Sequence, residues 1–153
     1  MKTILSVWNS GGKGKSGTIR ELARILLANY PGYIPVKPLT INIPSDIDFL
    51  IVIEIDGIRV GIVSQGDPGT GLDRKLKELA DEHNCDIIIC ATRTRGETVK
   101  IVDRIAKSRG YDTIRTSTYQ VSTTHRKLAN QLKAKHLLDL LQSLELLPVP
   151  ELV

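Results

Sequence analysis

The chain has 153 residues, which predicts one domain because domains usually hold about 100–200 residues. Hydrophobic residues make up 41% and charged residues 25% of the chain, ordinary values that exclude a disordered or fibrous protein. Aromatic residues make up only 4%, so the core must be aliphatic and a base-stacking surface for single-stranded nucleic acid is not expected.

The net charge of +4 is unevenly distributed along the chain. Residues 1–90 carry ten Lys/Arg and eleven Asp/Glu, whereas residues 91–153 carry eleven and six. This basic C-terminal half could meet phosphate or nucleic acid, but charged helix faces are common, so nucleic acid is not the favoured partner. Cys85 and Cys90 cannot build a disulfide framework, and no apolar run is long enough to cross a membrane. We therefore expect a cytoplasmic protein without a membrane partner.

Apolar runs and helical spacing predict strands that alternate with helices. The predicted elements are, in chain order, a strand at 3–8, a helix at 15–29, a hairpin of strands 49–55 and 58–64, a helix at 71–83, a strand at 86–91, a helix opened by residues 94–97 and closed by Gly110, a strand at 113–121 and a helix at 123–144. This alternation predicts an α/β fold with a mainly parallel sheet, helices on both faces, and one antiparallel edge strand from the hairpin. Residues 1–147 would form the single domain and residues 148–153 a loose tail.

Local signals refine these elements. Asp56-Gly57 is a strong hairpin signal, and Thr94-Arg95-Gly96-Glu97 fits a capping box that opens a helix. In the last helix, five leucines are expected to face the sheet: Leu128, Leu132, Leu137, Leu141 and Leu144. The proline-rich segment 30–48 has two open interpretations, a functional loop or a surface connection with a short strand at 39–43.

The most specific feature is a glycine-rich loop between the first strand and the first helix, Asn9-Ser10-Gly11-Gly12-Lys13-Gly14-Lys15-Ser16-Gly17-Thr18. Glycines let backbone N–H groups approach phosphate oxygens, and the following helix N-terminus adds partial positive charge. The usual pattern is Gly-x-x-x-x-Gly-Lys-Ser/Thr, and Asn9 stands at its first glycine, where Asn also tolerates a left-handed backbone. The pattern predicts that Lys15 reaches the β and γ phosphates and that the Ser16 hydroxyl binds Mg²⁺.

This loop resembles that of the P-loop NTPases, and most closely the deviant-Walker partition and division-site ATPases (ParA/MinD-like). Their loop reads Lys-Gly-Gly-x-Gly-Lys-Ser/Thr, which is similar to Ser10–Ser16 here. Residues 61–69 resemble that family's strand ending in Asp-x-Asp-Pro-Gln, and residues 86–90 its Walker B strand. The resemblance implies a three-layer α/β/α P-loop fold, ATP and Mg²⁺ as ligands, and a homodimer formed across the nucleotide.

Three positions depart from the family pattern. Ser10 stands at the signature lysine, although Lys13 is close by; Gln65 stands at the first aspartate of the Asp-x-Asp-Pro motif, and Cys90 at the Walker B aspartate. Asp67 is retained, in a hairpin-then-aspartate layout that also resembles the small GTPases. The guanine-reading Asn-Lys-x-Asp motif is missing after residues 86–91, which favours ATP over GTP.

The site that we expect combines these residues. Lys15, Asp67 and Gln65 would be catalytic, and Ser16 with Asp67 would hold Mg²⁺. Arg93 and Arg95 follow the strand at 86–91 on the side where α/β folds bind ligands, and would clamp phosphate or an anionic substrate. The nucleotide-binding set is Ser10, Gly11, Gly12, Lys13, Gly14, Lys15, Ser16, Gly17, Thr18, Arg93 and Arg95.

The simpler alternatives for these side chains are a turn aspartate, a polar strand-end glutamine and solvated arginines beside a helix cap. The expected function is binding of Mg·ATP with hydrolysis or transfer of its γ-phosphate, as an NTPase or a small kinase. Because each departure from the family pattern removes a group that positions water or magnesium, the alternative is a non-catalytic nucleotide-binding or DNA-associated module that uses the basic C-terminal half.

Overall fold

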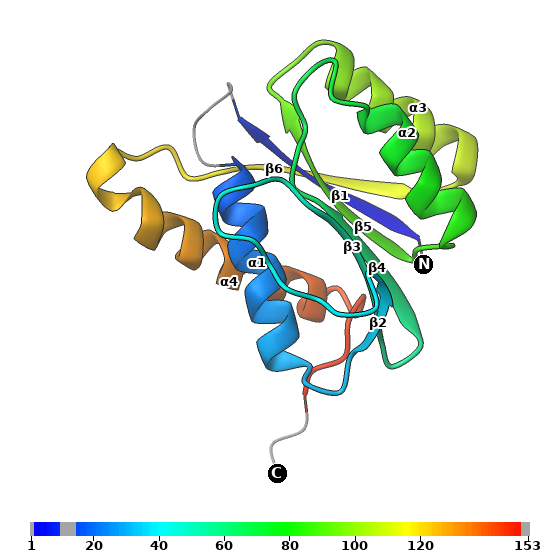
Figure 1. The fold of residues 1–153 in the computed structure, drawn as a ribbon. Helices are drawn as coiled ribbons and strands as arrows, with labels where there is room; N and C mark the ends of the chain where they lie inside the picture. The colour runs from blue at the N-terminus through cyan, green and yellow to red at the C-terminus, as the bar shows by residue number, and fades with distance from the viewer. Residues whose placement is uncertain (1, 10–14, 151–153) are drawn as a thin grey trace.

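A computed structural model describes residues 2–9 and 15–150 of the chain. Strands and helices alternate along it, except where three strands follow one another after the first helix (Figure 1). The elements are β1 (Thr3–Asn9), α1 (Lys15–Asn29), β2 (Ile34–Lys37), β3 (Leu50–Ile55), β4 (Ile58–Val63), α2 (Leu72–Lys77), the π-helical turn η1 (Glu78–Glu82), β5 (Ile87–Arg93), α3 (Glu97–Arg109), β6 (Asp112–Ser117), the 3₁₀ turn η2 (Thr123–His125) and α4 (Arg126–Ser143).

The strands form one six-stranded sheet in the order β2-β3-β4-β5-β1-β6. The neighbours β4, β5, β1 and β6 are parallel, whereas β3 runs antiparallel to both β2 and β4. The predicted α/β class with a mainly parallel sheet is confirmed. The expected place of the antiparallel strand at the sheet edge is wrong, because β2 pairs with β3 and takes the edge itself.

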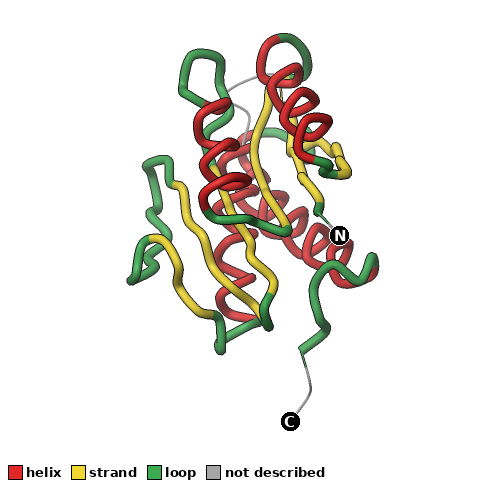
Figure 2. The backbone as a smooth tube through the Cα atoms, turned by 90° about the vertical axis from the view of Figure 1, so that its right-hand side faces the viewer, coloured by secondary structure: helices red, strands yellow, loops and turns green. Residues whose placement is uncertain are grey.

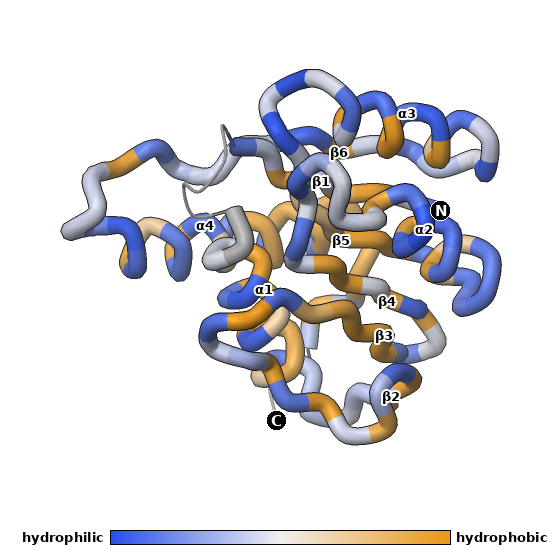
Figure 3. The backbone as a smooth tube through the Cα atoms, turned by 45° about the horizontal axis from the view of Figure 1, so that its top comes forward, coloured by the Kyte–Doolittle hydropathy of each residue, from blue (hydrophilic) through white to orange (hydrophobic). Residues whose placement is uncertain are grey.

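Helices cover both faces of the sheet (Figure 1). One aliphatic core lies between the sheet and the α1–α4 pair, and a second lies between the sheet and the α2–α3 pair. Successive residues of β5 alternate between the two cores, with Ile89 facing the first and Cys90 the second. This burial on both faces explains why residues 86–91 are continuously apolar. Figure 3 shows the hydrophobic residues concentrated in the central strands.

The β3–β4 hairpin turns at Asp56 and Gly57, as predicted. Both residues have a left-handed backbone, with φ of 49° and 82°, which is what a tight two-residue hairpin turn of type I′ requires. The register then pairs Ile55 with Ile58 and runs without interruption to Leu50 and Val63.

The connection from β2 to β3 is a long loop, residues 38–49, with neither helix nor strand (Figure 2). The alternative with a strand at 39–43 is therefore wrong, since the short strand of this segment is β2. Arg20 of α1 holds the loop: its Nε and Nη2 donate to the carbonyl oxygens of Pro44 (2.6 Å) and Ile47 (2.9 Å).

Three predicted elements differ from the structure in their extent or in their ends. The helix expected at 71–83 divides into α2 and the wider turn η1. The capping box is not formed, because α3 begins at Glu97 after Gly96 and has no side-chain cap. The strand expected at 113–121 ends at Ser117, which pairs with Trp8, and a last backbone hydrogen bond joins the N–H of Thr118 to the carbonyl oxygen of Trp8 at 3.3 Å. Gly110, with φ of 72°, ends α3 as predicted.

The buried face of α4 is only partly the predicted one. Leu137 and Leu141 are buried, whereas Leu128, Leu132 and Leu144 are 68%, 49% and 51% exposed. Figures 1 and 3 show the first turns of α4 extending beyond the sheet. Where α4 does meet α1, a Cβ on Gly17 would lie 2.4 Å from Nδ2 of Asn130, so the two helices approach too closely for a leucine there. Gly17 and Asn130 therefore form the contact at this point, whereas Leu137 and Leu141 belong to the core further along α4.

Candidate functional site

The candidate site lies at the carboxyl ends of the parallel strands. β1 lies between β5 and β6, and Asn9 at its end is in register with Arg93 at the end of β5. The glycine-rich loop leaves β1 at this point, and α1 begins at Lys15. Ser10 to Gly14 lie outside the described residues, and Lys15 and Ser16 are placed by their backbone as the first residues of α1.

Two of the predicted site residues contact each other directly. Nε of Arg93 lies 3.0 Å from Oδ1 of Asp67, across 26 positions of sequence. The contact depends on Gly66, where a Cβ would lie 1.8 Å from the carbonyl oxygen of Ala91, so the chain after β4 is pressed against β5. Both charged side chains are about two-fifths exposed (42% and 44%). Exposed ion pairs contribute only about 0–1 kcal/mol, so a phosphate or a cation could replace either partner at little cost.

Gln65 is placed differently from Asp67. Its Oε1 accepts a hydrogen bond from Nζ of Lys75 in α2 at 3.0 Å. Thr70 closes the turn that follows, because its hydroxyl donates to the carbonyl oxygen of Asp67 at 2.6 Å. The two side chains predicted to work together therefore have separate partners in this structure.

Arg95 lines a cleft beside this ion pair. The cleft, of about 530 Å³, is formed by Pro68 after β4 and by the β5–α3 connection, Arg93, Thr94, Arg95, Gly96 and Glu97. The backbone is anchored below it, because the N–H of Arg93 donates to Oγ1 of the fully buried Thr98 at 2.9 Å. Arg95 itself is exposed. The structure thus brings Asp67, Arg93 and Arg95 to one place at the sheet edge.

Asn9, which stands at the first glycine of the motif, belongs to β1 in the structure. It is the last residue of β1, fully buried, and its Nδ2 donates to Oγ1 of Thr118 at 2.5 Å. The side chain of Gln120 donates to the same hydroxyl oxygen at 3.0 Å. A buried amide therefore ties the end of β1, where the glycine-rich segment begins, to the chain just beyond β6.

Thr18 has a packing role in the structure. It is fully buried, and its hydroxyl donates to Oδ1 of Asn130 in α4 at 3.0 Å. This hydrogen bond joins α1 to α4, and Gly17 gives the space for that contact. The burial of Thr98, Thr118 and Asn130 was missed by the sequence interpretation, since single polar residues in apolar or threonine-rich segments give no distinctive spacing.

Cys90 cannot replace a metal-binding acid. It lies within β5, three positions before the strand ends, and is fully buried in the α2–α3 core. Burial raises the pKa of its thiol from 9.0 to about 12, because the charged thiolate would lose its hydration. The position matched to the family's Walker B aspartate thus carries a neutral core side chain.

Comparisons with protein-family models, with curated proteins and with solved structures found no match for this chain. The resemblance to the P-loop NTPases therefore rests on the motifs of the sequence. Among the described residues, no helix combines the length and the hydropathy that a membrane span needs.

Proposed function

We propose that the chain is a P-loop protein with a three-layer α/β/α fold that binds Mg·ATP and hydrolyses or transfers its γ-phosphate. The observation that supports the proposal is that the glycine-rich segment of the sequence connects the carboxyl end of β1 to the start of α1. β1 is one of four parallel strands, and its last residue, Asn9, is in register with Arg93 of β5. In open α/β sheets, ligands bind in the crevice outside the carboxyl ends of the strands.

Each residue in the proposed site has a defined role. Backbone N–H groups of residues 11–16 and the Lys15 ammonium would bind the phosphates, since phosphoryl transfer is catalysed mainly by positioning and charge stabilisation. The Ser16 hydroxyl and the Asp67 carboxylate would hold Mg²⁺. For this, Asp67 must release Arg93, whose guanidinium then becomes available to the γ-phosphate. Gln65 would orient the attacking water after leaving Lys75.

The test compares Mg·ATP binding by the wild type, Lys15→Ala and a control, Lys107→Ala, an exposed lysine of α3. A ligand present at 100 times its dissociation constant adds about 2.7 kcal/mol of stability, which a thermal unfolding assay detects readily. We expect stabilisation of the wild type and the control, and loss of at least about tenfold in affinity for Lys15→Ala. Equal binding by all three proteins would overturn the P-loop assignment.

Two observations favour a second candidate, a nucleotide-binding module without turnover. Cys90 is a buried neutral thiol at the matched Walker B position, and Asp67 is engaged by Arg93. Release of inorganic phosphate from Mg·ATP, measured alone and with small-molecule acceptors or DNA, separates the two functions. Binding without turnover under all these conditions would support the module and contradict the enzyme.

A further inference from the structure

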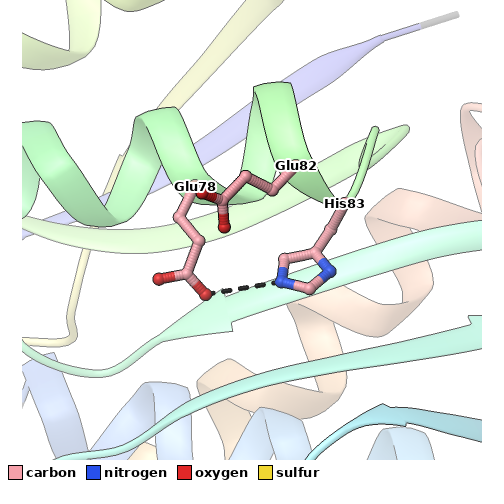
Figure 4. A group of neighbouring side chains, drawn as sticks. All are labelled: Glu78, Glu82 and His83. Carbon is pink, nitrogen blue, oxygen red and sulfur yellow. Dashed lines mark ion pairs between the residues drawn. The ribbon is translucent and has the colours of Figure 1, made fainter.

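A second candidate site lies at the opposite end of the parallel strands, where their amino ends are. η1 ends at Glu82, shortly before β5 begins at Ile87, so this turn lies near the amino end of β5 and away from the phosphate loop. Three side chains converge there, Glu78, Glu82 and His83 (Figure 4), with one potential ligand atom from each within 4.8 Å of the others. We propose that they form a binding site for a divalent transition metal ion of the Zn²⁺ class.

The distances suit tetrahedral coordination. Zinc bonds of about 2.0–2.2 Å at tetrahedral angles place neighbouring ligand atoms roughly 3.3–3.6 Å apart. Oε2 of Glu78 lies 3.4 Å from Nε2 of His83, so this pair already has the required separation. The carboxylate of Glu82, which is exposed, needs only a side-chain adjustment to complete the set. Three protein ligands leave the fourth position for water or for a bound molecule.

The π-helical turn is what brings the three ligands together. In an α-helix, positions i and i+5 point about 140° apart, so Glu78 and His83 would diverge. Here the N–H of His83 donates to the carbonyl oxygen of Glu78 at 3.2 Å, an i to i+5 hydrogen bond that widens the turn. Positions i, i+4 and i+5 then share one face. Arg59 fixes the end of the turn, because its Nη1 donates to the carbonyl oxygen of His83 at 3.1 Å.

A positively charged side chain, that of Lys37, already contacts this cluster. Nζ of Lys37 in β2 lies 2.5 Å from the Oε2 atom of Glu78 that faces His83. Lys37 is 48% exposed, so its ammonium can move into water when a divalent ion binds, at the small cost of a surface ion pair. The donor set selects the metal: an imidazole with carboxylates suits Zn²⁺, whereas Mg²⁺ and Ca²⁺ prefer sites made of oxygen alone.

The experiment titrates the untagged chain with Zn²⁺ by calorimetry, and with Co²⁺ to record the ligand-field spectrum. We expect one ion per chain, a tetrahedral Co²⁺ spectrum without thiolate charge transfer, and no comparable binding of Mg²⁺. His83→Ala and Glu82→Gln should each lower the Zn²⁺ affinity by about tenfold or more. Lys37→Ala should raise the affinity, because it removes the competing ammonium.

His125→Ala is the matched control, since His125 is exposed in η2 and lies outside the cluster. Circular dichroism of each variant shows whether it still folds. Because Glu82 is exposed, Glu82→Gln should fold normally, so a loss of Zn²⁺ binding in this variant reports on the site itself. Unchanged affinity in both His83→Ala and Glu82→Gln, or binding that His125→Ala abolishes, would overturn the site. Because this site is remote from Lys15, its failure would leave the nucleotide proposal unaffected, and the reverse holds as well.

Discussion

Gly66 is the residue on which the candidate site depends most directly. A Cβ there would lie 1.8 Å from the carbonyl oxygen of Ala91, and this neighbour is backbone of a central strand that cannot move aside. We expect Gly66→Ala to destabilise the fold by about 1–3 kcal/mol or more, and to separate Asp67 from Arg93. Urea unfolding measures the loss, with Gly32→Ala as the control because nothing lies within 4 Å of its added Cβ. An unchanged stability of Gly66→Ala would contradict the close approach of these strands.

Cys90 gives a prediction for alkaline pH. Its thiol pKa is about 12 in the folded chain against 9.0 ordinarily, so the neutral thiol contributes its full stability below pH 9 and loses it as pH rises toward 12. The unfolded state releases its proton first, which favours unfolding. At pH 10 this amounts to about 1 kcal/mol for one thiol.

The measurement follows the free energy of unfolding of the wild type and Cys90→Ala from pH 8 to pH 10. Cys85 titrates in both proteins, so the difference between the two slopes isolates Cys90. We expect the wild type to lose stability more steeply. Parallel slopes would mean that Cys90 is not held in a dry core, and reaction of the native thiol with a small alkylating reagent at pH 8 would lead to the same conclusion.

At the scale of elements, the last helix shows what leucine spacing alone cannot decide. Leu128 and Leu132 lie on one side of α4, and Leu137 and Leu141 on another, so the sequence holds two apolar stripes. Which of the two stripes is buried depends on the contact between α4 and α1. Gly17 of α1 lies against Asn130 of α4, and the small residue Ala134, one turn further along α4, is fully buried. That information lies more than a hundred positions away in the sequence.

This difference predicts contrasting effects of the same substitution along α4. Leu137→Ala should cost about 2–5 kcal/mol, because it opens a cavity in the α1–α4 core. Leu132→Ala should cost less than about 1 kcal/mol, because Leu132 is 49% exposed. Chemical denaturation of both variants checks the pair. Similar losses would mean that the first turns of α4 pack against the sheet after all.

At the scale of the whole molecule, features with local causes could be predicted from the sequence, whereas pairings between distant segments could not. The two-sided burial of β5 and the Asp56-Gly57 turn leave clear marks in the sequence. The edge position of β2 does not, because it comes from a proline-rich segment without periodicity. For the site, the sequence indicated Asp67 and Arg93 separately, but their contact depends on strand order and on Gly66.

Ion pairs between the two halves of the chain partly neutralise the excess positive charge of residues 91–153. Arg93, Arg104 and Arg109 of the basic half pair with Asp67, Asp73 and Asp81 of the other half, all at 2.9–3.0 Å. Arg109 and Asp81 share two hydrogen bonds of 2.9 Å, and the bonded guanidinium lowers the pKa of that carboxyl. The surplus of positive charge that could meet nucleic acid is therefore smaller than the count of residues 91–153 suggests.

This cancellation predicts little retention of duplex DNA at physiological salt. A protein that neutralises several phosphates loses affinity steeply with salt. The exposed lysines of α4, Lys127 and Lys135, are the group that could neutralise phosphates here. Fluorescence anisotropy with labelled DNA at about 50 and 200 mM salt tests this. We expect weak binding at the lower salt, lost at the higher and reduced by Lys127→Ala with Lys135→Ala. Tight binding that persists at the higher salt would show that the ion pairs of Arg104 and Arg109 with Asp73 and Asp81 leave enough positive charge to bind DNA. That result would favour the DNA-associated module over the ATP-cleaving enzyme.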